Sequence, residues 1–251
     1  MQNTLLDVLA FYDSYAETWD SRFGNQASDF HFLNARWDSF LEALPTHTKS
    51  MKALELGVGT GVYIHRAAPL FQKIIAVDGS ERMLDGLKKK YKKFDIANVE
   101  TLCCDVVSMQ SISNASIDVV YFFGLVEHIV EIDAFFKEIH RILKQDGLIV
   151  GVMPNKKCPW YGFRRYVRGT GSHCSTDRYY GFDDVCAWAE KYGFIATKNI
   201  YWGCVPAGLP RLPFQVLKFL EKPILLSFLR RWAGGLTFQL KKSNPIFHNQ
   251  Q

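Results

Sequence analysis

From residue 51 onward, short apolar runs alternate with longer segments in which apolar residues recur at helical spacing. A short apolar run bounded by turn residues is typical of a buried strand, and apolar residues three and four positions apart predict an amphipathic helix. The predicted strands are 52–56, 74–77, 99–103, 117–122, 148–153 and 195–202, and the predicted helices are 62–71, 81–94, 132–143 and 183–192. This alternation indicates an α/β fold, a parallel sheet with helices on both faces.

The first fifty residues are predicted to be helical. Apolar residues fall at helical spacing over 5–12 and again over 37–44, just before Pro45. The segment between them, Asp13–Asp20, is aromatic and acidic. Its aromatic residues Tyr15 and Trp19, together with Tyr12, can pack this region onto the core.

Composition narrows the class of protein. The 251 residues are 48% hydrophobic and 22% charged, as in ordinary globular proteins, and we expect one domain over 1–251. A net charge of +5 mildly favours acidic partners or an anionic membrane surface and does not indicate nucleic-acid binding. The basic run Lys88–Lys93 ends a predicted helix, where lysines form a solvated face.

Cysteines and termini suggest a compartment. The six cysteines show neither C-x-x-C pairing nor zinc-ligand spacing. The N-terminus lacks a basic segment followed by an apolar one, and no apolar run reaches the roughly 18 residues of a membrane span. These features predict a cytoplasmic, reducing location.

A glycine-rich turn follows the first strand. Glu55 precedes Gly57, Gly59 and Gly61, which stand at alternate positions before the next helix. Without a Cβ, such a turn lets the backbone approach a ligand closely, and the following helix directs free N–H groups toward it. Strand, glycine turn and helix predict a nucleotide-type cofactor site. The spacing differs from the G-x-G-x-x-G of dinucleotide sites.

Two acidic residues end the next strands. Asp78 stands 21 positions after Gly57, where a carboxylate can accept both hydroxyls of a ribose; the alternative is a helix-capping acid. Asp105 follows the apolar run of the third strand and is a candidate ligand-binding residue; alternatively, this acid only ends the strand.

Taken in order, these motifs resemble the class I S-adenosylmethionine-dependent methyltransferases, in the branch often labelled type 11, which includes quinone and sterol methyltransferases. The resemblance rests on the glycine turn, on Asp78–Leu84, on Asp105, on the block 117–129 and on Arg141–Leu148. It implies a Rossmann-like, mostly parallel sheet of seven strands with helices on both faces. The last strand, expected over 236–241, would be antiparallel, and residues 1–50 would form a helical cap.

The resemblance also implies S-adenosylmethionine as the cofactor and a set of residues that bind it. By analogy, Asp78 would bind the ribose, Asp105 the adenine amino group and the backbone of the next residue a ring nitrogen. The full set is Glu55, Gly57, Gly59, Gly61, Asp78, Gly79, Met83, Asp105, Val106 and Phe123.

Glu127 and His128 follow the fourth strand. Some quinone O-methyltransferases of this branch bind a divalent cation through this pair and a Glu three residues earlier, but the position here is Gly124. Two ligands leave a hard cation under-coordinated, so we predict no metal site. His128 is then a candidate general base; alternatively, the pair only organises the turn by hydrogen bonds.

Two long segments should face the acceptor, because ligands bind at the carboxyl ends of parallel strands. The loop 154–180 interleaves aromatic and basic residues, which suits an acidic or aromatic acceptor or an anionic membrane surface. The insert 203–235, outside a core of 51–202 and 236–242, contains an amphipathic helix pair over 209–232. That pair suits membrane or lipid contact, or packing on the domain or a second subunit.

The resulting hypothesis is methyl transfer to an oxygen or carbon of an apolar or lipid-linked acceptor, with peripheral membrane contact through 209–232. The alternatives are a soluble sugar or small-metabolite acceptor, and a non-catalytic cofactor-binding scaffold. Nothing in the sequence indicates an oligomeric state.

Overall fold

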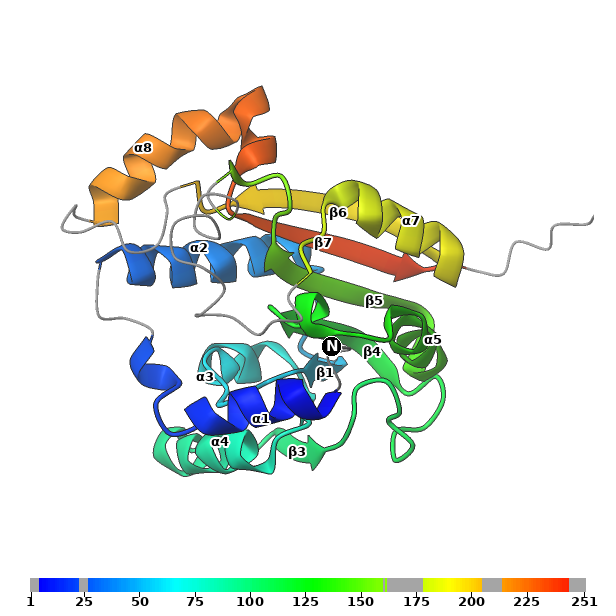
Figure 1. Ribbon diagram of the computed structural model, residues 1–251. Helices are drawn as coiled ribbons and strands as arrows, with labels where there is room; N and C mark the ends of the chain where they lie inside the picture. The colour runs from blue at the N-terminus through cyan, green and yellow to red at the C-terminus, as the bar shows by residue number, and fades with distance from the viewer. Residues whose placement is uncertain (1–4, 23–26, 160, 162–177, 205–213, 244–251) are drawn as a thin grey trace, which may run out of the picture.

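The computed structural model describes residues 5–22, 27–159, 161, 178–204 and 214–243 (Figure 1). Within them, seven strands form one sheet in the order β3-β2-β1-β4-β5-β7-β6. The strands are β1 (Lys52–Leu56), β2 (Lys73–Asp78), β3 (Val99–Cys103), β4 (Ile117–Phe123), β5 (Leu143–Pro154), β6 (Phe194–Trp202) and β7 (Gly235–Lys242). Only β7 runs antiparallel to its neighbours, so the predicted Rossmann-like α/β fold is confirmed.

Helices cover both faces of the sheet (Figure 1). The α-helices are α1 (Leu5–Tyr15), α2 (Ala27–Ala43), α3 (Ile64–Ala67), α4 (Glu81–Phe94), α5 (Ile132–Ile142), α7 (Phe182–Tyr192) and α8 (Phe214–Leu226), with 3-10 turns η1 (Asp20–Arg22), η2 (Ala68–Leu70), η3 (Val126–His128) and η4 (Phe228–Trp232). One apolar core joins α5 and α7 to the sheet. A second joins α2, α3 and α4 to the opposite face, because β-strand side chains alternate between faces.

Helix α4 matches its predicted range because its local signals agree. The Ser80 hydroxyl caps the helix by accepting the Met83 backbone N–H at 3.1 Å, and Asp95 ends it in the left-handed conformation. The buried face of the helix carries Met83, Leu84 and Leu87. Its lysines lie on the outer side, as expected for a solvated face.

Three segments differ from the sequence-based expectation. The continuous helix expected over 62–71 is a four-residue α3 followed by the 3-10 turn η2, which contains Pro69 and so cannot continue α-helical hydrogen bonds. Strand β5 starts at Leu143 instead of residue 148, with a register shift where the polar residues 144–147 bulge out. The expected helix pair of the insert is one α-helix, α8, and the 3-10 turn η4; residues 205–213 lie outside the described part.

None of the described helices combines the length and apolar composition needed to cross a membrane.

Candidate cofactor and acceptor site

Four turns meet at one edge of the sheet because β1, β2, β3 and β4 are parallel. They are the glycine turn after β1, the turn after β2, the loop after β3 and η3 after β4. The backbone links neighbouring turns: Val58 N–H donates to Val77 O at 3.0 Å, and Cys104 N–H donates to Asp78 O at 3.2 Å. This edge therefore collects the residues that the sequence singles out.

All three glycines of the turn adopt left-handed backbone conformations, with φ of 62° at Gly57, 55° at Gly59 and 71° at Gly61. Side chains disfavour this region by about 1–2 kcal/mol per residue. A Cβ at Gly61 would also overlap the Leu87 side chain. At Gly59, by contrast, a Cβ would meet only Trp19 Nε1, at 3.9 Å. The middle of the turn therefore keeps open space that a ligand can approach.

Asp78 bridges two of these turns. Its Oδ2 accepts the Gly59 backbone N–H at 2.7 Å, and its Oδ1 accepts the Ser80 backbone N–H at 2.9 Å. Burial raises the pKa of this carboxyl, although the backbone hydrogen bonds oppose the shift. The Gly79 backbone also hydrogen-bonds this carboxylate, which has about four acceptor positions, so about one remains available for a ligand's hydroxyl.

Glu55 lies beneath the turn and is 3% exposed. Its Oε2 accepts the Tyr121 hydroxyl at 2.9 Å, from the neighbouring strand β4. Burial raises the pKa of Glu55 to about 8, against the lowering effects of Tyr121 and the Arg36 guanidinium. The side chain therefore carries its proton at neutral pH and stabilises the strand pair from inside.

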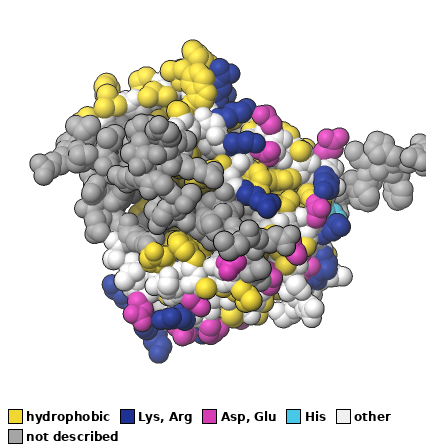
Figure 2. Space-filling model, viewed as in Figure 1, with side chains coloured by type: hydrophobic (Ala, Val, Ile, Leu, Met, Phe, Trp, Pro, Cys, Tyr) yellow, Lys and Arg dark blue, Asp and Glu magenta, His cyan; other side chains and the backbone are white. Residues whose placement is uncertain are grey.

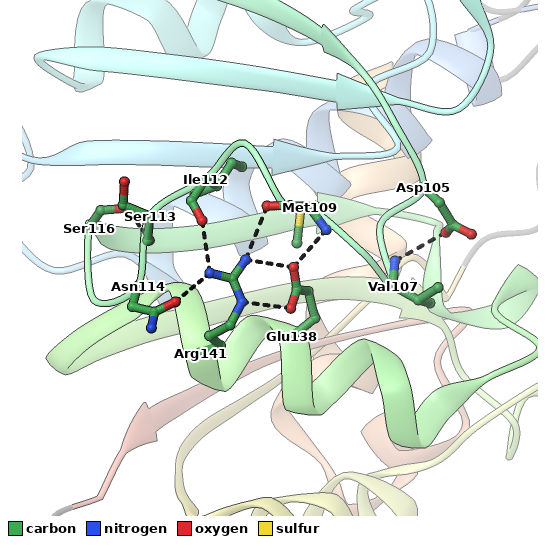
Figure 3. Close-up of polar contacts among 9 residues, drawn as sticks. All are labelled: Asp105, Val107, Met109, Ile112, Ser113, Asn114, Ser116, Glu138 and Arg141. Carbon is green, nitrogen blue, oxygen red and sulfur yellow. Dashed lines mark hydrogen bonds and ion pairs between the residues drawn. The ribbon is translucent and has the colours of Figure 1, made fainter.

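Asp105 and Val106 begin the loop between β3 and β4, which α5 holds in place (Figure 3). The Arg141 guanidinium donates to the backbone oxygens of Ile112 at 2.8 Å and Met109 at 3.0 Å. Glu138 pairs with Arg141 at 2.7 Å and accepts the Met109 backbone N–H at 2.6 Å. Val106 is buried, whereas Asp105 is half-buried with Oδ1 on the Val107 backbone N–H at 3.1 Å. Arg141 thus fixes the loop that carries Asp105.

Phe123 ends β4 and lies among aromatic rings of the N-terminal half, 4.5 Å from Tyr63 and 4.9 Å from Phe40 between centroids. Five residues later, His128 Nε2 lies 2.7 Å from the Tyr12 hydroxyl of α1. The preceding residue, Glu127, is buried, with 6% of its surface exposed. The fourth strand thus brings a histidine to the same edge as the glycine turn.

The segment α1–η1 closes over this edge and contacts three of its turns. Asp13 accepts the Ser80 hydroxyl, Asp20 Oδ1 accepts the Thr60 hydroxyl at 2.6 Å, and Tyr12 meets His128. In Figure 1, α1 lies beside α4 at the lower left of the molecule. A Cβ at Gly79 would lie 2.7 Å from Leu9 Cδ2 of the same helix. The segment therefore packs on the domain at this edge of the sheet, and its role as a cover over a cofactor stays a prediction.

Arg36 of α2 is a site residue that the sequence analysis missed. A Cβ at Gly124 would lie 2.6 Å from its Nη2, and its guanidinium carbon lies 5.5 Å from the centre of the Phe123 ring. Its Nε is buried without a hydrogen-bond partner among the described residues. The available signal was the spacing of Phe32, Arg36 and Phe40, which places a charge on an apolar helix face. A fixed cation therefore lies beside Gly124.

The remaining residues of the predicted set lie at the same edge. Gly79 follows β2 directly, and Met83 is buried in the first turn of α4. Within the described part of the chain, no three His, Cys, Asp or Glu side chains are arranged to hold a metal ion. The left-handed glycines, the remaining acceptor position of Asp78 and the buried Arg36 Nε without a partner among the described residues fit a ligand that combines a ribose with an anionic group.

The fold and the site are those of an α/β protein that binds a nucleotide-type cofactor. Comparison with known proteins restricts the choice of cofactor and activity. Residues 54–151 match the family model described as "Methyltransferase domain", of type 11. A "Probable S-adenosylmethionine-dependent methyltransferase" of Mycobacterium tuberculosis is 30% identical over 105 residues, 41% of this chain and 35% of that protein. A "Ubiquinone biosynthesis O-methyltransferase" of Pelagibacter ubique is 28% identical over 116 residues, covering 46% of this chain and 47% of that protein.

Among solved structures, an S-adenosylmethionine-dependent methyltransferase from Aquifex aeolicus superposes with a TM-score of 0.58 at 16% identity, covering 82% of this chain and 89% of that one. This likeness concerns the fold. The chain spans between 35% and 47% of the length of the two curated relatives. The match to the type 11 methyltransferase domain thus covers residues 54–151 of the 251-residue chain.

Proposed function

We propose that this protein transfers a methyl group from S-adenosylmethionine to an apolar or lipid-linked acceptor. The observation that carries the first half is the glycine turn itself, with three left-handed glycines tied by Gly59 to the Asp78 carboxyl. S-Adenosylmethionine supplies both the methyl group and its leaving group, so the protein needs mainly to position, exclude water and remove a proton.

Each turn of the edge has a proposed role in holding the cofactor. Gly57–Gly61 gives the close backbone approach, and Asp78 accepts a ribose hydroxyl through its remaining acceptor position. Asp105 and the backbone of Val106 face the adenine, in the loop that Arg141 holds. The Arg36 guanidinium offers a partner for the carboxylate of the methionine half, since planar guanidinium groups match carboxylates.

His128 is the proposed group for proton removal. A neutral imidazole can accept the proton of an acceptor hydroxyl as its oxygen attacks the methyl group. In the structure its Nε2 meets the Tyr12 hydroxyl at 2.7 Å, so an acceptor hydroxyl would have to take the place of Tyr12 or use it as a relay. The competing role for the residue is to hold α1 onto η3 through the same hydrogen bond.

The acceptor half of the proposal rests on the α8–η4 insert. It leaves β6 and returns to β7 at the carboxyl edge of the parallel strands, the same edge of the sheet that carries the cofactor turns. Large apolar side chains on it are exposed, among them Phe219 and Phe228. The relative from Pelagibacter ubique, named for ubiquinone biosynthesis, supports an apolar acceptor.

Titration calorimetry with S-adenosylhomocysteine tests the cofactor half. We expect binding by the intact chain and a loss of about tenfold or more with Asp78→Asn, because hydrogen bonds to a charged group contribute about 1.5–3 kcal/mol. Asp118→Asn is the matched control. Asp118 Oδ2 also accepts a strand N–H, from Lys52 at 2.9 Å, but at the opposite edge of the sheet. No binding by the intact chain would sink the proposal.

Incubation with S-adenosylmethionine labelled in its methyl group tests the acceptor half. Whole-cell extract is divided into organic-soluble and water-soluble fractions, and each is supplied with the enzyme and the label. Label transferred only into the organic fraction supports a lipid-linked or apolar acceptor. Label only in the water-soluble fraction points to a sugar or small metabolite, and label in neither, with normal cofactor binding, points to a scaffold.

A further inference from the structure

The α8–η4 surface, residues 214–232, concentrates exposed apolar side chains. Seven of the twelve large hydrophobic side chains that are exposed in the described part of the chain lie between Val216 and Trp232. Leu226, Phe219 and Phe228 are 78%, 75% and 71% exposed. Figure 2 shows hydrophobic side chains along the upper edge of the molecule, where Figure 1 places α8. Single exposed apolar residues are ordinary, but a contiguous cluster marks an interaction surface.

The charges on this surface have one sign. Its exposed charged side chains, among those described, are Lys222, Arg230 and Arg231. The one acid in the sequence of this range, Glu221, is 3% exposed; it meets His31 Nε2 of α2 at 2.7 Å and accepts the Cys204 backbone N–H. Glu221 therefore presents no negative charge outward and instead anchors α8 to the domain.

The surface also carries the arrangement of cation and aromatic rings found at membrane interfaces. The Arg231 guanidinium lies 4.8 Å from the Trp232 ring centre and 5.9 Å from that of Phe228. Further hydrogen bonds fix the end of η4: Asn155 Nδ2 donates to Arg231 O at 2.9 Å and Ala233 O at 2.8 Å. The apolar side chains are therefore exposed on a segment that hydrogen bonds hold to the domain.

We propose that α8–η4 docks on an anionic lipid bilayer, with Phe219, Leu226 and Phe228 entering the interface and Arg230 and Arg231 meeting the head groups. Charge complementarity favours this occupant over a second copy of the chain. A two-fold contact through this face would bring the same basic residues together, with no exposed acid among its described side chains to offset them. The proposal rests on the lipid-linked acceptor for its purpose, since docking would hold the carboxyl edge of the sheet beside the lipid phase.

Vesicle co-sedimentation of the full chain tests the docking directly, without methyl transfer. We expect pelleting with vesicles of phosphatidylcholine mixed with phosphatidylglycerol, and much less with phosphatidylcholine alone. Raising the salt from about 0.1 M to about 1 M shortens the screening length from about 10 Å to about 3 Å and should release most of the protein. Arg230→Gln combined with Arg231→Gln should weaken binding to the anionic vesicles by about fivefold per residue.

Phe219→Ser combined with Phe228→Ser should weaken vesicle binding by about tenfold or more, because two large apolar side chains no longer enter the interface. Phe94→Ser is the matched control: Phe94 is 47% exposed beside Lys93, but at the end of α4, and its loss should change nothing. An unchanged midpoint of urea unfolding shows that each variant is folded.

Two results would overturn the docking proposal: vesicle binding that is absent or unaffected by the paired Phe variant, or a concentration-dependent dimer that this variant abolishes in place of vesicle binding. The second result would assign the face to another copy of the chain. The two proposals fail separately. Vesicle binding with label only in water-soluble acceptors refutes the lipid-linked acceptor, while labelled lipid without vesicle binding refutes the docking surface.

Discussion

Alanine substitutions at Gly59 and Gly61 separate the two demands that the glycine turn places on its residues. Both positions are left-handed, with φ of 55° and 71°, so each alanine loses about 1–2 kcal/mol of stability through the backbone alone. At Gly61 the new methyl group also overlaps the Leu87 side chain in the second core. Overpacking of this kind costs about 1–3 kcal/mol more.

The free energy of unfolding should therefore fall by about 1–2 kcal/mol for Gly59→Ala and by about 2–5 kcal/mol for Gly61→Ala. Urea titration followed by circular dichroism measures both values, and equal m-values show that the same surface unfolds. For ligand affinity, the order of the two variants should be the reverse of their order in stability. The Gly59 methyl group enters the open space of the turn, so Gly59→Ala should lose more S-adenosylhomocysteine affinity per unit of stability lost.

Two results would refute this reasoning. Equal losses of stability in the two variants would mean that the Leu87 contact does not constrain the turn. Unchanged ligand affinity in Gly59→Ala would mean that the ligand does not approach the middle of the turn, whatever the match to the methyltransferase family.

Three further predictions concern residues around the site. The pKa of Glu55 is 4.5 in the unfolded chain and about 8 in the folded one, so this residue makes the free energy of unfolding fall as the pH rises between these values. Glu55→Gln should therefore reduce the change of the urea midpoint with pH across that window, and an unchanged slope contradicts this prediction. Arg141→Met removes the hydrogen bonds that hold the loop of Asp105 and should weaken S-adenosylhomocysteine binding, measured by calorimetry. Lys144→Met breaks only the exposed ion pair with Asp118 and should leave the affinity unchanged. Equal effects of the two substitutions contradict a positioning role for Arg141. Ser80→Ala removes the α4 cap and should cost about 1 kcal/mol in urea unfolding; a loss near zero contradicts the capping role.

Much of the fold could be predicted because local signals and global pattern agree in most segments. The range of α4 was predicted to the residue, since its cap, its apolar stripe and its terminal lysines all indicate the same boundaries. Strand β5 was predicted five residues short because Lys144–Gly147 is polar and ends in glycine, which is typical of a turn. In the structure that stretch bulges within the strand, with Asp146 at a φ of 64°.

Some residues of the candidate site could be predicted from the sequence and others could not. Asp78, Asp105 and the glycines follow strands at fixed positions, so sequence order alone brings them to one edge of a parallel sheet. Arg36 could not be placed in this way. Its proximity to Gly124 depends on how α2 crosses the sheet, which no local pattern encodes. The same holds for the Tyr12 contact with His128, which joins positions 116 residues apart.

The place of β7 in the sheet bears on how the chain acquires its fold during synthesis. Within the described part of the chain, β7 is the last strand in sequence but lies between β5 and β6, and its Leu236, Phe238 and Leu240 are fully buried. Until it emerges from the ribosome, β5 has an unpaired edge and β6 has no neighbour, so both wait with apolar surface open to water. A nascent chain therefore exposes the apolar faces of β5 and β6 until the sheet closes, and this interval is the point at which a chaperone would act.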